Sequence, residues 1–449
     1  MVKLILSPIE KKMMILQYNT MTKKIAFIII FLLFATGLFA DGENLTIKVA
    51  VLGPGSEVYF WWGHIALIVE DSETGRSRFY DYGLFSFDNE NFYYNFAYGR
   101  LLYSTGASPT ERNIDLAVER NRSLIFYTLD LPPESRVIVR DFLENNVLPE
   151  NRDYYYQHFY DNCSTRIRDV IDLATNGQFK EKYNVPGKFT LRDHVRRHTW
   201  FSPAADWVLN FWMGQVIDTK ITEWDDMFLP AEVGKRINDF WYTDINGERR
   251  KLVMDEEIIF ESTGRPIVLD TPRKQWPVLL VFSIVLSAVF GLFFYLYSKK
   301  ILVGKILAGI SMSFCGLVFG LAGLALYFLS IFTNHDYTYE NANMIFSGPI
   351  LLLVIPLGLS YAFTKKPEKQ ITYDLLLRLL WLSVVLGIFI SMVIKLLPGF
   401  YQKNLPDQML MLPIALLFTF QPVGLNSIID KYLRPKKNKK QKRGKHGRK

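Results

Sequence analysis

The chain has 449 residues, enough for two or three domains, and a formal net charge of +8 at neutral pH. Its two cysteines, Cys163 and Cys315, lie too far apart in sequence to form a four-ligand zinc cluster. A disulfide is not expected either, because Cys315 lies in an apolar run and Cys163 in a soluble segment. We therefore expect no metal and no cofactor.

The first 40 residues resemble an export signal. An apolar run at 25–40 follows Lys23 and Lys24 and precedes a polar segment that begins at Asp41. The run is short for a helix that crosses a bilayer. We assign residues 1–40 to a signal peptide or an N-terminal anchor, and in both cases the chain from about residue 41 onward is expected to be exported.

Residues 41–272 mix strand and helix patterns, which predicts an α+β domain. Alternating apolar residues predict a strand over 45–52, a second strand within 57–70 and a returning strand at 78–83. The other expected elements are strands at 98–103 and 123–131, helices after Pro132 and Cys163 and at 190–197, 203–213 and 225–236, and a closing hairpin within 251–269.

From residue 276 onward, long apolar runs alternate with short polar connections. The runs are 276–298, 306–332, 344–363, 375–397 and 409–429. Each is about long enough to cross a bilayer as a helix. The connections after the first, third and fifth runs are rich in lysine, so the positive-inside rule places residue 276 outside, in agreement with the export signal.

These runs predict an all-α five-helix transmembrane domain over residues 273–430. A basic cytoplasmic tail follows at 431–449, and it contains no acidic residue after Lys436. Such a tail is expected to meet anionic lipid or nucleic acid only non-specifically, so no specific nucleic-acid partner is expected.

Cys163 lies at the start of a predicted helix. An apolar stripe from Ile167 to Ala174 predicts the helix, and Asp161 or Asn162 can cap its first turn. The unpaired N–H groups and the positive end of the helix dipole favour the thiolate in this position. The cysteine is therefore a candidate nucleophile, although a small buried residue at a helix start is the simpler interpretation of the cysteine alone.

A thiol nucleophile needs a base and a group that orients the base. His64 follows Gly63 on a predicted strand, and a strand-borne histidine against a helix-start cysteine is the arrangement of papain-like thiol enzymes. Asp81 lies on the next strand and can accept the imidazole N–H. The alternatives are a structural histidine beside Trp61 and Trp62 and a surface acid that flanks a turn.

Four segments and the apolar C-terminal half resemble the Lnb family of bacterial membrane lipoprotein N-acyltransferases. The segments are Trp-Gly-His-Ile-Ala-Leu at 62–67, Tyr-Asp-Tyr-Gly at 80–83, Tyr-Asp-Asn-Cys-Ser-Thr-Arg-Ile-Arg-Asp at 160–169 and Phe-Leu-Pro at 228–230. The resemblance implies a permuted papain-like (NlpC-type) thiol domain, in which histidine precedes cysteine, as in lecithin:retinol acyltransferase. It implies Cys163 as nucleophile and His64 as base, whereas Asp81 is assigned from its strand position.

The resemblance also implies a reaction. A fatty acyl chain would pass from a membrane phospholipid donor, through a Cys163 thioester, to the α-amino group of a diacylglyceryl lipoprotein acceptor. The enzyme would be a multi-pass protein of the bacterial inner membrane with a periplasmic catalytic domain, and the shared lipid bilayer would raise the effective concentration of its reactants. A membrane-anchored cysteine peptidase or amidase acting on cell-wall peptides is the alternative, and a non-enzymatic binding protein is a third.

Three further residues are candidates for substrate binding. Arg166 follows Cys163 in the predicted helix and can meet an anionic head group, or form ion pairs on a solvated face. His335 and Asn341 lie in the predicted outer loop after the second apolar run. They can contact a head group or the accepting amine, or they can belong to a polar turn that only joins two helices.

Overall fold

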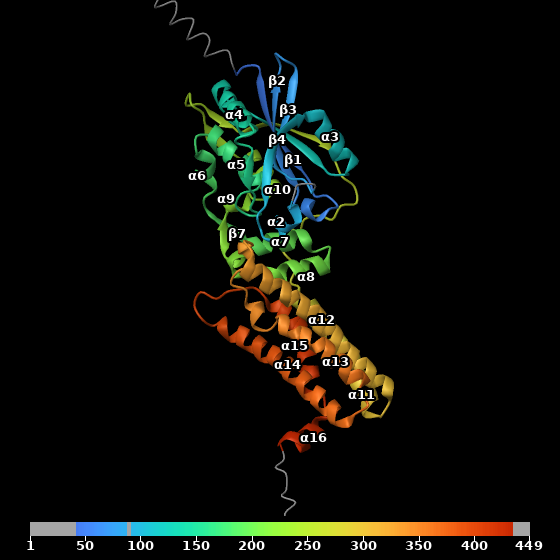
Figure 1. Ribbon diagram of the computed structural model, residues 1–449. Helices are drawn as coiled ribbons and strands as arrows, with labels where there is room; N and C mark the ends of the chain where they lie inside the picture. Colours follow the sequence, from blue (N-terminus) through green and yellow to red (C-terminus); the bar gives the residue numbers. More distant parts are fainter. Residues whose placement is uncertain (1–41, 88–90, 434–449) are drawn as a thin grey trace, which may run out of the picture. The chain divides into compact units, whose positions relative to one another are not determined.

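The computed structural model describes residues 42–87 and 91–433 (Figure 1). The predicted signal peptide or anchor at 1–40 and most of the basic tail lie outside these residues. The described chain divides into two compact units. The sheet unit contains residues 42–85, 102–185 and 222–265, and the helical unit contains the remaining described segments, including 186–221 and 266–433.

The sheet unit is built around a seven-stranded antiparallel sheet of order β11-β5-β1-β2-β3-β4-β6. The strands are β1 (Leu45–Leu52), β2 (His64–Asp71), β3 (Arg76–Leu84), β4 (Leu102–Pro109), β5 (Leu124–Leu129), β6 (Asp153–Tyr155) and β11 (Val253–Phe260). In register, His64 lies opposite Leu52, and Ala66 opposite Asp81. The pairing of β2 with β3 therefore brings His64 and Asp81 to neighbouring strands.

Helices cover the sheet on both faces. On one face, Ala117 of α3 (Thr110–Glu119) packs in a buried cluster with Ala66 and Phe79. On the other face, α5 (Cys163–Ala174) packs against β2 and β3, and α4 (Pro133–Asn146) packs against α5. The remaining elements of this unit are η1 (Val58–Phe60), α6 (Gln178–Tyr183), α9 (Glu223–Asp226), α10 (Pro230–Asn238), β9 (Trp241–Thr243) and β10 (Arg249–Lys251).

Three predicted elements of this region differ from the structure. The strand expected at 98–103 is displaced to β4, because 98–101 follow the short helix α2 (Phe92–Ala97) and include Gly99 with a φ of +70°. The helix expected at 225–236 is two helices, since Pro230 begins α10. The closing hairpin is wrong: β11 pairs with β5, and β10 with β9.

The helical unit consists mainly of apolar helices. They are α11 (Trp276–Ser298), α12 (Leu302–Phe332), α13 (Val354–Phe363), α14 (Pro367–Ile394), α15 (Leu405–Phe420) and α16 (Leu425–Ile428). The smaller elements are α2, β7 (Pro186–Thr190), α7 (Leu191–Thr199), α8 (Pro203–Trp212), η2 (Gln215–Asp218), β8 (Lys220–Thr222), η3 (Asp336–Thr338), η4 (Ala342–Ile345), η5 (Pro349–Leu353) and η6 (Ile429–Leu433).

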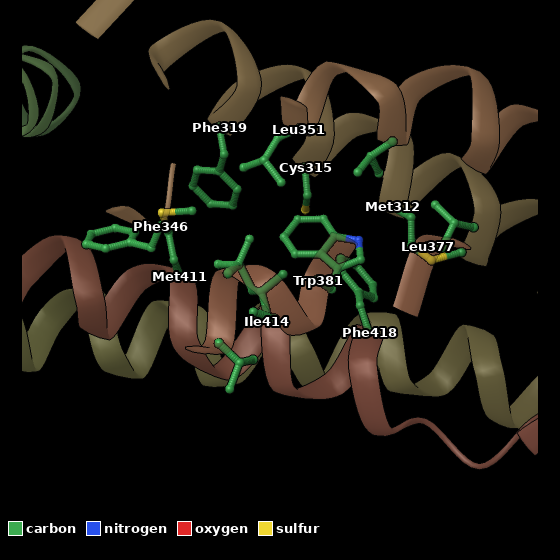
Figure 2. Close-up of a cluster of buried hydrophobic side chains, with 14 of the residues drawn as sticks. Met312, Cys315, Phe319, Phe346, Leu351, Leu377, Trp381, Met411, Ile414 and Phe418 are labelled. Atoms are coloured by element: carbon green, nitrogen blue, oxygen red, sulfur yellow. The ribbon is translucent and has the colours of Figure 1, made fainter. Parts of the chain in front are cut away.

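The core of the helical bundle is aromatic and aliphatic. Trp381 of α14 is fully buried, and it packs on Phe418 of α15 with ring centroids 5.0 Å apart (Figure 2). Between α12 and α13 the backbones meet directly, because a Cβ on Gly309 would lie 2.5 Å from the carbonyl oxygen of Gly358. Such close approach at small residues is typical of helices that pack within a membrane.

In the described residues, three helices are long and apolar enough to cross a membrane: α11, α12 and α14. A fourth candidate is α15 together with the segment Leu425–Tyr432, if the two are counted as one span despite the bend of 60° between them. The third apolar run supplies only a helical segment at Pro349–Phe363, because it is interrupted near Gly348 and Pro349. The predicted count of five spans is therefore not confirmed, whereas the α+β domain followed by apolar helices is.

Candidate active site

The capping of α5 fixes the position of Cys163. The Asn162 side chain accepts a hydrogen bond from the Thr165 N–H at 3.0 Å, and the Thr165 hydroxyl accepts one from the Asn162 N–H at 2.8 Å. Asn162, one of the two predicted caps, is thus the N-cap, and Cys163 is the first residue of the helix. The thiol residue is 8% exposed. It lies where the helix dipole favours a negative charge.

Asn162 also connects this helix start to the surrounding chain. Its side-chain amide donates to the carbonyl oxygens of His158 and Phe228, at 2.8 and 2.9 Å. The first of these residues precedes the helix, and the second belongs to the Phe-Leu-Pro segment far along the sequence. One side chain therefore holds three parts of the sheet unit around Cys163.

We expect Asn162→Ala to lower the stability of the protein by about 1–3 kcal/mol, because it removes a helix cap and the two amide hydrogen bonds to the carbonyl groups of His158 and Phe228. Thermal unfolding of the full chain measures this loss. Asn162→Ser is the matched variant: its hydroxyl can still cap the helix but lacks the amide donors, so it should be less destabilising. Equal stability of the alanine variant and the wild type would contradict this role of the cap.

His64 lies between the thiol and a carboxylate. Its Nε2 atom is 2.5 Å from Oδ1 of Asp81, the contact that the strand positions predicted. Gly63 precedes it with a φ of +81°, and a Cβ there would lie 2.8 Å from the Leu52 carbonyl oxygen. Only glycine fits this close approach of β2 to β1 without strain.

The charges around His64 favour the imidazolium. Burial lowers the pKa of His64. The charge of Asp81, the charge of Cys163 and hydrogen bonds to both raise it by a larger amount, so that the pKa is about 10. At neutral pH the histidine therefore carries a proton between two groups that can be anionic. An imidazolium beside a cysteine is the arrangement that can activate the cysteine as a nucleophile.

Two tyrosines near the thiol were not assigned from the sequence. Tyr154 is 9% exposed, and its hydroxyl has no hydrogen-bond partner among the described residues. Burial raises the pKa of Tyr154 and of Tyr156, and the charge of Cys163 raises both further. The aromatic run at 154–156 is visible in the sequence, but only the pairing of β6 with β4 brings it toward the site.

Arg122 is a second group that the sequence did not single out. It is 3% exposed, its Nε donates to the Gly53 carbonyl at 3.0 Å, and its guanidinium lies 4.1 Å from the Phe60 ring centroid. Burial and Arg120 lower its pKa to about 10, against the attraction of Cys163. Its Nη2 has no partner among the described residues, so it can donate one more hydrogen bond.

The three predicted substrate-binding residues make contacts within their own units. Arg166 forms a two-bonded ion pair with Asp161, at 2.6 and 2.9 Å, and lies over the Tyr154 ring at 4.0 Å. In the helical unit, His335 contacts the Phe96 carbonyl and the Tyr337 hydroxyl, at 3.1 and 2.8 Å.

Asn341 is 5% exposed and donates to the Phe211 carbonyl at 3.0 Å. Its side-chain oxygen accepts from Gln402 and from the Asn343 N–H, both at 2.9 Å. These contacts give Arg166, His335 and Asn341 structural roles, and substrate binding by them stays a prediction. Within 42–87 and 91–433, no group of three or more His, Cys, Asp or Glu side chains is arranged to hold a metal ion.

Comparison with known families identifies the thiol region. Residues 39–197 match the Lnb N-terminal periplasmic domain, and the match includes His64, Asp81 and Cys163. Neither the curated proteins nor the solved structures gave a match. Apolar helices long enough to cross a membrane follow the matched region. Residues 39–197 are therefore similar to the Lnb N-terminal periplasmic domain, as the resemblance to the Lnb family predicted, and the chain is a membrane protein with a periplasmic domain.

Proposed function

We propose that this protein is a lipoprotein N-acyltransferase in which Cys163 carries the acyl group. The observation that carries the proposal is the contact of His64 with both Cys163 and Asp81. The Lnb domain and the apolar helices support a membrane-borne lipid substrate over a soluble one. The proposed location is the bacterial inner membrane, with the thiol domain in the periplasm.

In the first half-reaction, the Cys163 thiolate attacks the carbonyl carbon of an acyl ester in a membrane phospholipid. The new S–C bond forms as the C–O bond to the glycerol breaks. The His64 imidazolium gives its proton to the departing alkoxide, and a lysophospholipid leaves. The products are a thioester on Cys163 and a neutral His64 imidazole.

In the second half-reaction, the uncharged α-amino group of a diacylglyceryl lipoprotein attacks the thioester carbonyl. An amide bond forms as the C–S bond breaks, and His64 takes the proton that the nitrogen loses. The thiolate and the imidazolium are thereby restored. Asp81 stabilises the imidazolium and holds its ring in one orientation throughout.

Both half-reactions pass through a tetrahedral oxyanion that needs hydrogen-bond donors. The Cys163 backbone N–H is one candidate, because the first N–H groups of a helix have no partner within the helix and Cys163 begins α5. The Tyr154 hydroxyl is a second, since it is buried and has no partner among the described residues.

Tyr154→Phe is expected to lower kcat by about 10²-fold or more with little change in KM, because the donor acts on charge that develops in the transition state. Steady-state kinetics with a phospholipid donor and a lipopeptide acceptor measure both constants. Tyr155→Phe is the matched control, since Tyr155 is 70% exposed. Unchanged kcat in the Tyr154 variant would remove this hydroxyl from the mechanism.

The proposed function is tested in a bacterial strain that lacks its own lipoprotein N-acylation. A reporter lipoprotein is purified with and without this protein, and mass spectrometry determines the state of its N-terminal lipopeptide. An added amide-linked acyl chain is expected only when the protein is present. A free α-amino group in both samples would contradict the proposal, and cleavage of peptides instead would favour a cysteine peptidase or amidase.

A further inference from the structure

The helical unit contains a basic cavity that none of the steps above uses. It has a volume of about 380 Å³, within the range of about 300–1,000 Å³ that is typical of small-ligand sites. It lies where α7, the segment before α11 and the start of α15 meet. The charged and aromatic side chains that line it are Asp193, Arg196, Arg273, Lys274, Trp276 and Lys403.

The charge of this cavity is strongly positive. The one acid, Asp193, is already paired with the Lys403 ammonium at 2.9 Å. Burial raises the pKa of Asp193, but Lys403 and Thr190 lower it by a larger amount. The net pKa is below its usual value, so the carboxylate stays ionised. Three basic side chains also line the cavity: Arg196, Arg273 and Lys274. No second carboxylate among the lining residues neutralises them.

Arg196 has a hydrogen-bond donor that the described residues leave unused. Its Nη2 donates to the Arg273 carbonyl at 2.5 Å, whereas its Nε is buried and has no partner among the described residues. Burial lowers the pKa of Arg196, and the charge of Arg192 lowers it too, against the attraction of the Asp206, Asp193 and Asp407 carboxylates. A partly buried guanidinium with an unsatisfied N–H is stabilised by an anionic oxygen, for which its planar group of donors is suited.

The helices add to this positive field and place it at the membrane surface. α11 begins at Trp276 and α15 at Leu405, and both residues line the cavity. The positive dipole ends of two helices therefore meet there. Trp276 opens an apolar helix of 23 residues, the position at which tryptophan anchors a helix at the lipid–water interface. Arg273 lies over the Trp200 ring at 4.3 Å.

We infer that this cavity binds the phosphate group of a membrane phospholipid. Arg196 and Arg273 supply guanidinium donors, Lys274 and Lys403 supply ammonium charge, and the two helix starts supply the dipole field. A phospholipid places its phosphate at the depth where an apolar helix begins, so its acyl chains can remain in the bilayer while the head group occupies the cavity. Free phosphate offers the same oxygens but no such anchorage.

The site can be tested independently of acyl transfer. The full-length Cys163→Ala protein in detergent micelles is titrated calorimetrically with three probes: dihexanoylphosphatidylethanolamine, inorganic phosphate and dihexanoylglycerol. We expect the phospholipid to bind most tightly, inorganic phosphate to bind weakly and compete with it, and dihexanoylglycerol to bind least. Equal affinity for inorganic phosphate would overturn the lipid assignment, and equal affinity for dihexanoylglycerol would overturn recognition of phosphate.

Variants locate the binding. Arg273→Gln with Lys274→Gln should weaken phospholipid affinity by about tenfold or more, since each removes a charge from the cavity. Lys365→Gln with Lys366→Gln is the matched control, because it removes two exposed charges that do not line the cavity. Lys274→Glu alone covers the case in which the double variant is unstable, and it should weaken binding further than Lys274→Gln. Affinity that falls equally in the control, or in none of the variants, would overturn the proposal.

Discussion

Cys163→Ala is expected to abolish acyl transfer, with a loss on the order of 10⁴-fold or more, because no other group on α5 can form the thioester. The side chain lies at the first position of a capped helix, so the substitution leaves the cap of Asn162 and Thr165 intact. Activity is measured as amide formation on a lipopeptide acceptor.

Cys315→Ala is the matched control for this variant. Cys315 is 3% exposed and lies in the core of the helical bundle, where it packs among apolar side chains (Figure 2). It should retain activity with at most a modest loss of stability. Residual transfer by Cys163→Ala at more than about a tenth of the wild-type rate would show that Cys163 carries no acyl group.

Asp81→Asn is expected to lower kcat/KM by a factor on the order of 10²–10⁴. The amide is close in shape to the carboxylate but has no charge, so it no longer stabilises the His64 imidazolium. The pKa of His64 should then fall from about 10, and we expect a decrease of about 1–3 units. The alkaline limb of the pH–rate profile should move to lower pH by the same amount.

The same pair makes folding depend on pH. The pKa of His64 is raised from its usual 6.5 to about 10, so the native state binds the proton more tightly than the unfolded chain. The resulting stabilisation is complete below about pH 6.5 and is lost as pH rises through about 10. Thermal unfolding of wild type and Asp81→Asn should therefore differ most at the acidic end of this window.

Glu70→Gln is the matched control for Asp81→Asn. Glu70 lies on β2 and pairs with Lys48 at 2.9 Å, so the variant removes a carboxylate from the same sheet. Its pH–rate profile should match that of the wild type. An alkaline limb that stays near pH 10 in Asp81→Asn would show that another group holds the imidazolium.

The centre of the site could be predicted because each of its residues has a local signal. A cap before an amphipathic stripe placed Cys163 at a helix start, and a turn between two alternating segments placed Asp81 beside His64. Tyr154 and Arg122 have no such signal. Their positions depend on the pairing of β6 with β4 and on the junction of β1 with β5, which are contacts between segments far apart in the sequence.

The limits of the fold prediction have the same cause. The hairpin expected within 251–269 failed because β11 pairs with β5, and the alternation of its residues does not specify the partner. Segments 86–101 and 186–221 belong to the helical unit although they lie among residues of the sheet unit in sequence. The compact units are therefore not divided by a single boundary at residue 272. That residue 272 separates the thiol domain from the transmembrane domain stays a prediction.

The apolar runs were the easiest part to locate and the hardest to count. Hydropathy identified every helix of the bundle, but it does not detect a break in the backbone. Gly348 and Pro349 interrupt the third run, and α15 is followed by a sharp bend. An apolar run that contains residues of low helix propensity therefore need not form one straight spanning helix.

The central claim is that an acyl group resides on Cys163 between the two half-reactions. The direct measurement is mass spectrometry of the Cys163 peptide after purified protein is mixed with a phospholipid that carries an isotope-labelled acyl chain. We predict a labelled, hydroxylamine-sensitive adduct on Cys163 that disappears when a diacylglyceryl lipopeptide is added, while the label appears in an amide of that lipopeptide. Label that reaches the lipopeptide without appearing on Cys163, or that never leaves the phospholipid, would contradict the account.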